Sequence, residues 1–309
     1  MSLFNPFAFF QSDSTRAASG ETTSSAPEPG PLARSANERH RQLVEFNESP
    51  CSDPGRATLP DLVEAQVSRL SGRLAIRSPE IQLTYGEMWA RATRVARTLR
   101  NAGIGPGAHV GLDLVGSVER AIAVLGVLRV GATCVPLSGP RPVLRTLDTR
   151  SLSCILTHSS GGNAGSAGTL DIPTLCMRGG GGAGASGRLI PVDEPSPDDW
   201  AWMTVGAFRG ARRLEGSTHR DLVRRVCWHR EHTTLDEGAR TLQVAPADSE
   251  LYLQELMCTW GTGGCLVIDS GATSRSPDTI LQALTSRSVD RLVLPASTLR
   301  AGAQALGVD

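Results

Sequence analysis

The residues best suited to chemistry in this sequence lie between positions 205 and 230, where glycines and arginines gather. Gly206 and Gly210 fall between a predicted strand and the amino end of a predicted helix. Such an arrangement can present backbone N–H groups to a phosphate. Seven arginines and two acidic residues occupy the span from 209 to 230, a local excess of five positive charges. Composition alone leaves two interpretations open, a phosphate-facing loop or a solvated helix face.

Two other groups of residues match known sites only in part. Cys227, His229 and His232 are close enough in sequence to suggest a metal site. On a helix, however, Cys227 lies away from the face that the two histidines share, so an ordinary helix with a solvated side is favoured. The glycines from Gly103 to Gly107 follow a helix rather than a strand, which indicates a helix end and a turn instead of a dinucleotide loop. We therefore assign no metal ligand and no catalytic residue.

Composition excludes several classes of function. The 309 residues carry 31 arginines, no lysine and 31 acidic residues, so the formal net charge is zero. A neutral chain lacks the electrostatic footprint of a nucleic-acid binder or of a membrane-surface protein, so neither partner is expected. Without lysine, this polypeptide has no residue for Schiff-base chemistry and no phosphate-loop ammonium. Its seven cysteines show no CxxC spacing, which favours a reducing, cytoplasmic location over a disulfide framework.

The hydrophobic pattern predicts helices and strands in alternation from Thr58 onward. Capping boxes begin two helices at Thr58 and Thr84, and Ser117 begins a third. Further helices are expected near 218–232, 251–259 and 277–286. Strands are expected near 74–76, 81–83, 109–115, 133–137, 154–157, 172–177, 202–205, 241–245, 265–268 and 291–294. This alternation predicts an α/β fold with parallel sheets flanked by helices.

The chain is expected to divide into a tail and two lobes. Residues 1–38 are rich in Ser, Thr, Ala, Pro and Gly and are predicted to be disordered. Residues 39–197 form the first predicted α/β lobe, which includes a flexible glycine-rich loop at 159–187. Residues 198–309 form the second lobe. No apolar run reaches the length of about eighteen residues that a membrane-spanning helix needs.

Six short motifs follow one another in a recognisable order along residues 43–309. They are Leu83-Thr-Tyr-Gly-Glu-Met88 and the segments 102–111, 128–137, 154–157, 243–256 and 290–295. In this order they resemble the adenylation domains of nonribosomal peptide synthetases, relatives of the acyl- and aryl-CoA ligases and luciferases. The resemblance implies the first part of the large N-terminal domain of adenylate-forming enzymes. It also implies AMP-forming ligase chemistry with ATP and Mg²⁺.

The resemblance places the family's phosphate loop, approximately TSGSTGxPKG, on residues 205–214, where only Gly210 is in register. Phe208 and its neighbouring arginine replace small residues, and Arg213 replaces the lysine. Bulky side chains in a loop that must bring backbone amides close to a pyrophosphate should obstruct it. We expect a degenerate nucleotide-binding loop in which Gly206, Gly210 and Arg213 are the remaining candidates for phosphate contact.

The family's FDxSxQE segment, which the resemblance aligns with residues 249–255, places an aspartate against the amino group of the substrate. Glu250 stands at that position, one methylene longer. It is either a partner for an amine or a surface residue at a helix start. Leu251 and Gln254 match pocket-lining positions, but they are too few to indicate a substrate.

The resemblance implies that a full domain continues past Asp309 with an adenine-contacting segment, a ribose-binding aspartate and a lid that carries a catalytic lysine. We therefore expect no adenylation from this polypeptide alone and no firmly bound cofactor, with ATP and Mg²⁺ as the cofactors of any surviving activity. The favoured hypothesis is a non-catalytic scaffold that binds another protein of a peptide synthetase assembly or self-associates. The alternatives are a ligase completed in trans by a separate chain and a non-functional remnant.

Overall fold

The computed structural model describes residues 55–114, 117–137, 152–157, 174–176, 195–208, 211–232, 237–269, 280, 288–294 and 300. All of them belong to one unit, Asp53–Asp309. The predicted tail at 1–38 lies outside these residues. So do most of the predicted loop at 159–187 and, apart from residue 280, the predicted helix near 277–286.

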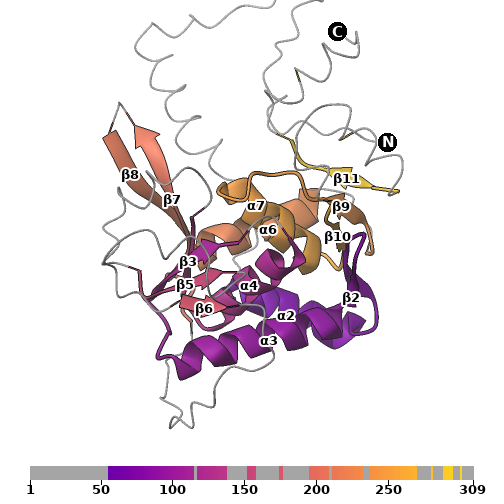
Figure 1. Cartoon of the computed structure of the whole chain (residues 1–309). Coiled ribbons are helices and arrows are strands. Elements are labelled where there is room, and N and C mark those ends of the chain that lie inside the picture. The colour runs from indigo at the N-terminus through magenta and orange to yellow at the C-terminus, as the bar shows by residue number, and fades with distance from the viewer. Residues whose placement is uncertain are drawn as a thin grey trace, which may run out of the picture. The chain divides into compact units, whose positions relative to one another are not determined.

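One sheet combines strands from two distant parts of the sequence (Figure 1). Its order is β11 (Arg291–Leu292), β9 (Arg240–Leu242), β10 (Cys265–Val267), β1 (Leu74–Arg77) and β2 (Gln82–Thr84). The strands pair in parallel except for β1 and β2, which are antiparallel. Because β1 pairs with β10 through Ile76 and Leu266, the early strands are held by contacts between residues far apart in the chain.

The other sheet contains the strands between residues 109 and 218. Its order is β6 (Thr174–Cys176), β5 (Cys154–Thr157), β3 (His109–Asp113), β4 (Thr133–Pro136), β7 (Trp200–Phe208) and β8 (Ala211–Thr218). The first five strands are parallel, which confirms the predicted sheet type, and β8 is antiparallel to β7. The hydrophobic pattern does not predict β8, because the sequence Ala-Arg-Arg-Leu-Glu-Gly-Ser-Thr lacks the alternation and the β-branched residues of a typical strand.

Both sheets draw strands from either side of the predicted lobe boundary at residues 197 and 198. Strands β7 and β8 follow that boundary and join the sheet of β3 to β6, whereas β1 and β2 precede it and join β9 to β11. Strand pairing defines sheets rather than lobes, so the division of the chain into two lobes stays a prediction.

The described helices are α2 (Leu59–Leu70), α3 (Tyr85–Asn101), α4 (Val118–Arg129), α6 (His219–His232) and α7 (Glu250–Gly261). Their predicted starts are confirmed. The Thr84 N–H donates to Glu87 Oε2 at 2.8 Å, and the Glu87 N–H donates to Thr84 Oγ1 at 3.2 Å, which completes a capping box. Gly103 follows the end of α3 with a φ of 78°, a conformation that favours glycine, so the predicted helix end is also confirmed.

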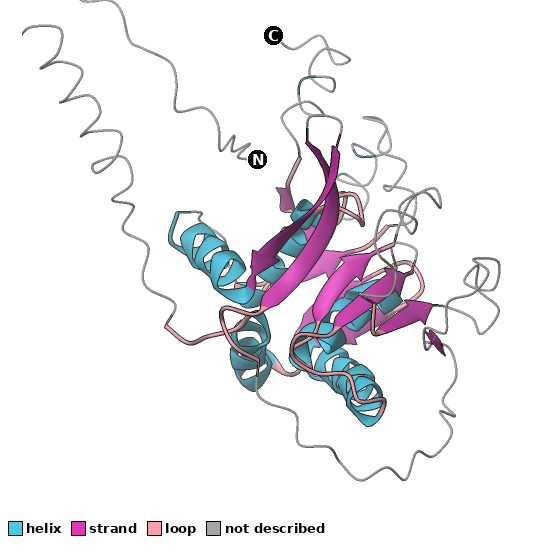
Figure 2. Cartoon of the chain, turned by 90° about the vertical axis from the view of Figure 1, so that its left-hand side faces the viewer, coloured by secondary structure: helices cyan, strands magenta, loops and turns pink. Residues whose placement is uncertain are grey.

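The helices connect the two sheets (Figure 2). Helix α3 packs against β1 and β2 and against α4, which in turn packs on β3 and β4. Helix α7 contacts β9 and β10 of one sheet and β7 of the other. Ten of the 12 residues of α4 are buried, including every residue from Arg120 to Leu128, so this helix lies at the centre of the core.

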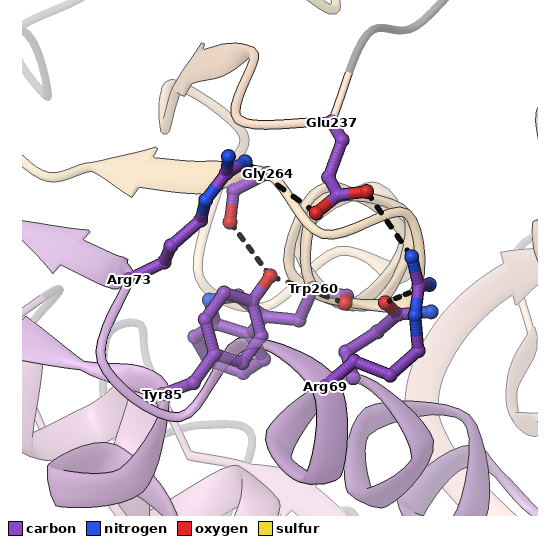
Figure 3. A network of polar contacts seen from close by, with 7 residues as sticks. Arg69, Arg73, Tyr85, Glu237, Trp260 and Gly264 are labelled. Atoms are coloured by element: carbon purple, nitrogen blue, oxygen red, sulfur yellow. Dashed lines mark hydrogen bonds and ion pairs between the residues drawn. The ribbon is translucent and has the colours of Figure 1, made fainter.

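A polar network joins the start of α3 to the end of α7 (Figure 3). The Tyr85 hydroxyl donates to the Gly264 carbonyl at 2.7 Å, and the Trp260 carbonyl lies 3.2 Å away. Burial raises the pKa of Tyr85, so the phenol is a neutral donor. At the exposed side of the network, the Glu237 carboxylate accepts from Arg69 at 3.2 Å and Arg73 at 3.4 Å. The network therefore fixes α3 against the turn between α7 and β10.

Replacing Tyr85 with Phe should lower the free energy of unfolding by about 1–3 kcal/mol, because buried carbonyl groups lose their donor. Urea unfolding followed by circular dichroism measures the change. Glu237→Gln is the control, since it removes exposed ion pairs that contribute no more than about 1 kcal/mol. Equal stability of the Tyr85→Phe variant and the unmodified chain would show that the hydroxyl does not hold this junction.

Candidate functional site

The residues predicted to form a phosphate loop belong to a β-hairpin. Strands β7 and β8 pair without interruption from Trp202 and Ser217 to Phe208 and Ala211. Gly206 and Arg213 are Cα partners across the two strands. Gly210 lies outside the described residues.

The sequence predicts both glycines between a strand and the amino end of a helix, and in the structure Gly206 lies within β7. All of β8 separates them from α6, which begins at His219. In an antiparallel ladder, alternate N–H groups bond to the partner strand and the others point outward along the edge. The paired residues therefore cannot converge their N–H groups on one phosphate as a glycine-rich loop does.

Glu250 is the first residue of α7, and its carboxylate is engaged by two neighbours. The Ser217 hydroxyl, from the end of β8, donates to one oxygen. The Arg225 guanidinium, from α6, forms an ion pair with the other. The Glu250 side chain is 36% exposed, so it is a half-buried residue at a helix start. The Arg225 guanidinium already balances the negative charge with which an amine would pair.

A second contact lies one helical turn further along. Gln254 Nε2 and His229 Nε2 are 2.7 Å apart. Arg225 and His229 are four residues apart on α6, and Glu250 and Gln254 are four residues apart on α7. Side chains from two successive turns of α6 therefore contact side chains from two successive turns of α7. Burial, with the nearby Arg291 and Arg225 guanidinium groups, lowers the pKa of His229 to about 4. The histidine is therefore neutral at pH 7.

Glu255 is a buried carboxyl group to which the sequence assigned no role. It is 1% exposed, and its oxygens accept from the backbone N–H groups of Val244 at 3.3 Å and of Ala245 at 3.1 and 3.2 Å. Burial raises its pKa to about 8, although these N–H donors oppose the shift. Its place among apolar residues of a helix was the available signal.

Arg120 is a second buried ionisable residue that sequence reasoning missed. It is fully buried in the first turn of α4, and its guanidinium donates to the carbonyls of Leu114 and Ala247. It also lies 5.3 Å from the centre of the Tyr252 ring. These contacts join the end of β3 to the segment before α7, so Arg120 positions α7 from the other side.

The three residues considered for metal binding have other surroundings. Cys227 is buried, and His232 stacks on Trp228 with ring centres 4.8 Å apart. His229 contacts Gln254, as described above. Among the residues that the structure describes, no group of three or more His, Cys, Asp or Glu side chains is placed to hold a metal ion.

Comparisons with known proteins agree with this fold. Residues 63–160 match the AMP-binding enzyme family. The AMB antimetabolite synthetase AmbB of Pseudomonas aeruginosa is 28% identical over 237 residues, which cover 74% of this chain and 18% of AmbB. Tyrocidine synthase 3 of Brevibacillus parabrevis is 31% identical over 203 residues, which cover 62% of this chain and 3% of the synthase. The chain is a homologue of nonribosomal peptide synthetase adenylation domains.

A solved structure supports the same fold for this adenylation-domain homologue. The N-terminal subdomain of Klebsiella oxytoca NpsA, in complex with 3-hydroxyanthranilyl-AMSN, has a TM-score of 0.66 and 20% sequence identity. The match covers 80% of the homologue and 62% of the NpsA subdomain. The homologue therefore spans less than two thirds of each of these relatives. Within its described residues, it has no helix whose length and apolar content would allow it to cross a membrane.

The buried Glu255 predicts a characteristic pH dependence of stability. Its folded-state pKa of about 8 is above its unfolded value of about 4.3, so the folded chain binds this proton more tightly. The contribution is present at low pH and is lost as the pH rises through this window. The unmodified chain should lose stability between pH 5 and pH 8 more steeply than Glu255→Gln, as measured by urea unfolding at several pH values.

Glu237→Gln, which keeps Glu255, is the control for this measurement. Parallel profiles of stability against pH for the unmodified chain and Glu255→Gln would contradict the assignment.

Proposed function

We propose that this chain is a non-catalytic adenylation-domain homologue that acts as a scaffold or binding partner within a nonribosomal peptide synthetase assembly. The observation that carries the proposal is the β7–β8 pairing of residues 205–208 with residues 211–214, which belong to the expected phosphate loop. A ladder of paired residues does not offer the converging N–H groups that bind a nucleotide phosphate.

The substrate side of the site supports the same proposal. The carboxylate of Glu250 is already paired with Arg225 and accepts from Ser217. A substrate ammonium group would compete with an intramolecular guanidinium, which is present at high effective concentration. Glu250 is thus a structural link between α6 and α7 in this proposal, rather than an amine-binding residue.

The apolar framework supports a folded role for the protein. Helices α3, α4 and α7 keep continuous buried faces, and both sheets are complete enough to bury their central strands. A chain that retains this packing presents a stable surface to a partner. We infer a cytoplasmic location, because Cys134, Cys154, Cys258 and Cys265 are free thiols.

The alternative, a ligase completed in trans by another chain, is supported by two retained charges. Arg213 carries a cation where the family has a lysine, and Glu250 keeps a carboxylate. This alternative predicts binding of ATP with Mg²⁺ at micromolar concentration. The two proposals therefore differ in one measurable quantity.

A calorimetric titration of ATP with Mg²⁺ into the purified chain tests the proposal, after circular dichroism has confirmed that the chain is folded. We expect no binding heat. Saturable micromolar binding that is lost in Arg213→Ala would contradict the non-catalytic proposal and support the alternative. Arg94→Ala, on the exposed face of α3, is the matched control for removal of one positive charge.

A further inference from the structure

The β7–β8 hairpin extends past the sheet to which it belongs. Strand β4 pairs with β7 only through Cys134 and Trp202, whereas β8 pairs with β7 along its whole length. Beyond this point, residues 203–208 and 211–216 form a two-stranded ribbon. Within the described part of the chain, no other strand pairs with this ribbon. Figure 1 shows it rising clear of the other described strands.

A two-stranded ribbon of this kind has backbone N–H and C=O groups that do not pair within the ribbon. The outer edge of β8 has no neighbouring strand among the described residues, so the N–H and C=O groups of alternate residues along it form no ladder. Isolated hairpins are marginally stable, and a third strand adds both hydrogen bonds and packing. Edges like this one bind extended peptides by adding them to the sheet.

An aromatic side chain lies at the base of the ribbon. Trp200 is 47% exposed, which makes it one of the two large apolar side chains that the described residues expose. Its ring covers Gly216 of β8, where a Cβ atom would lie only 2.7 Å from the ring. A partly exposed tryptophan is a residue type enriched at binding hot spots. The edge therefore has an apolar contact next to its free backbone groups.

Charge indicates which kind of strand this edge would accept. Strand β8 contains Arg212 and Arg213 and one acidic residue, Glu215. A second copy of the chain would bring the same positive charges to the same edge, and like charges on adjacent strands are destabilising. A strand rich in Glu or Asp would instead be attracted to it.

We propose that the outer edge of β8, with Trp200 at its base, binds an acidic, extended segment of a partner protein as an added strand. This inference rests on the proposed scaffold function and deepens it, because it names the chemical class of the partner segment. The bound segment would extend the sheet in the order β4, β7, β8 and partner strand.

The test uses the full 309-residue chain and a capped decapeptide in which Glu and Val alternate. We expect the peptide to bind in a calorimetric titration and to protect backbone amides of β8 from hydrogen exchange. The double variant Arg212→Glu, Arg213→Glu should bind the peptide at least about tenfold more weakly, and Trp200→Ala should also weaken binding. The matched control is Arg94→Glu, Arg97→Glu, which makes the same change of charge on the exposed face of α3 and should bind like the unmodified chain.

Several results would overturn this proposal. The first is that the Glu-Val peptide does not protect β8 from exchange. The second is that the β8 double variant, once circular dichroism shows it folded, binds the peptide as tightly as the unmodified chain does. The third is that a Lys-Val decapeptide binds the unmodified chain as tightly as the Glu-Val peptide does. Protection of β8 that rises with protein concentration, without peptide, would assign the edge to a second copy instead. Because no nucleotide enters this experiment, its failure is distinguishable from failure of the non-catalytic proposal, which the ATP titration decides.

Discussion

The parallel pairing of β1 with β10 is the constraint on which the rest of this structure depends. It joins residues near the start of the described chain to residues near its end. Bringing such distant segments together costs chain entropy, which the long-range contacts between them must offset. The Tyr85 hydroxyl and the Trp260 indole, which donates to the Ala75 carbonyl at 3.0 Å, add buried hydrogen bonds at the same junction. With α7 fixed in this way, its first turn can hold Arg225 of α6, and α6 in turn fixes the end of β8.

This chain of contacts explains how the candidate site differs from a nucleotide site. Glu250 is positioned by α7, but α6 and β8 supply the groups that occupy its carboxylate. The neighbouring hairpin uses its backbone in strand pairing rather than in a loop. In both cases, polar groups that could contact a ligand bond to other residues of the chain. Within the described part of the chain, the outer edge of β8 stays unpaired, and this edge supports the proposed binding role.

Local signals in the sequence predicted much of the fold. The capping residues Thr58, Thr84 and Ser117 and the apolar periodicity that follows each of them locate three helices, and the motif order predicts the family. Strand β8 was missed because its pairing with β7, rather than its own composition, makes it a strand. The partners of Glu250 and Gln254 were missed for a related reason, since Arg225 and His229 reach them only through the packing of two helices. The burial of Glu255 is likewise a tertiary property.

Native-state hydrogen exchange of the β7 and β8 amides, measured by NMR with and without ATP and Mg²⁺, tests the central claim most directly. The claim is that a paired hairpin occupies the position of the phosphate loop. It predicts alternating protection along residues 203–208 and 211–216 that stays the same when the nucleotide is added. Rapid exchange throughout these residues, with protection appearing only in the presence of ATP and Mg²⁺, would show a loop that closes on a nucleotide and would contradict the account.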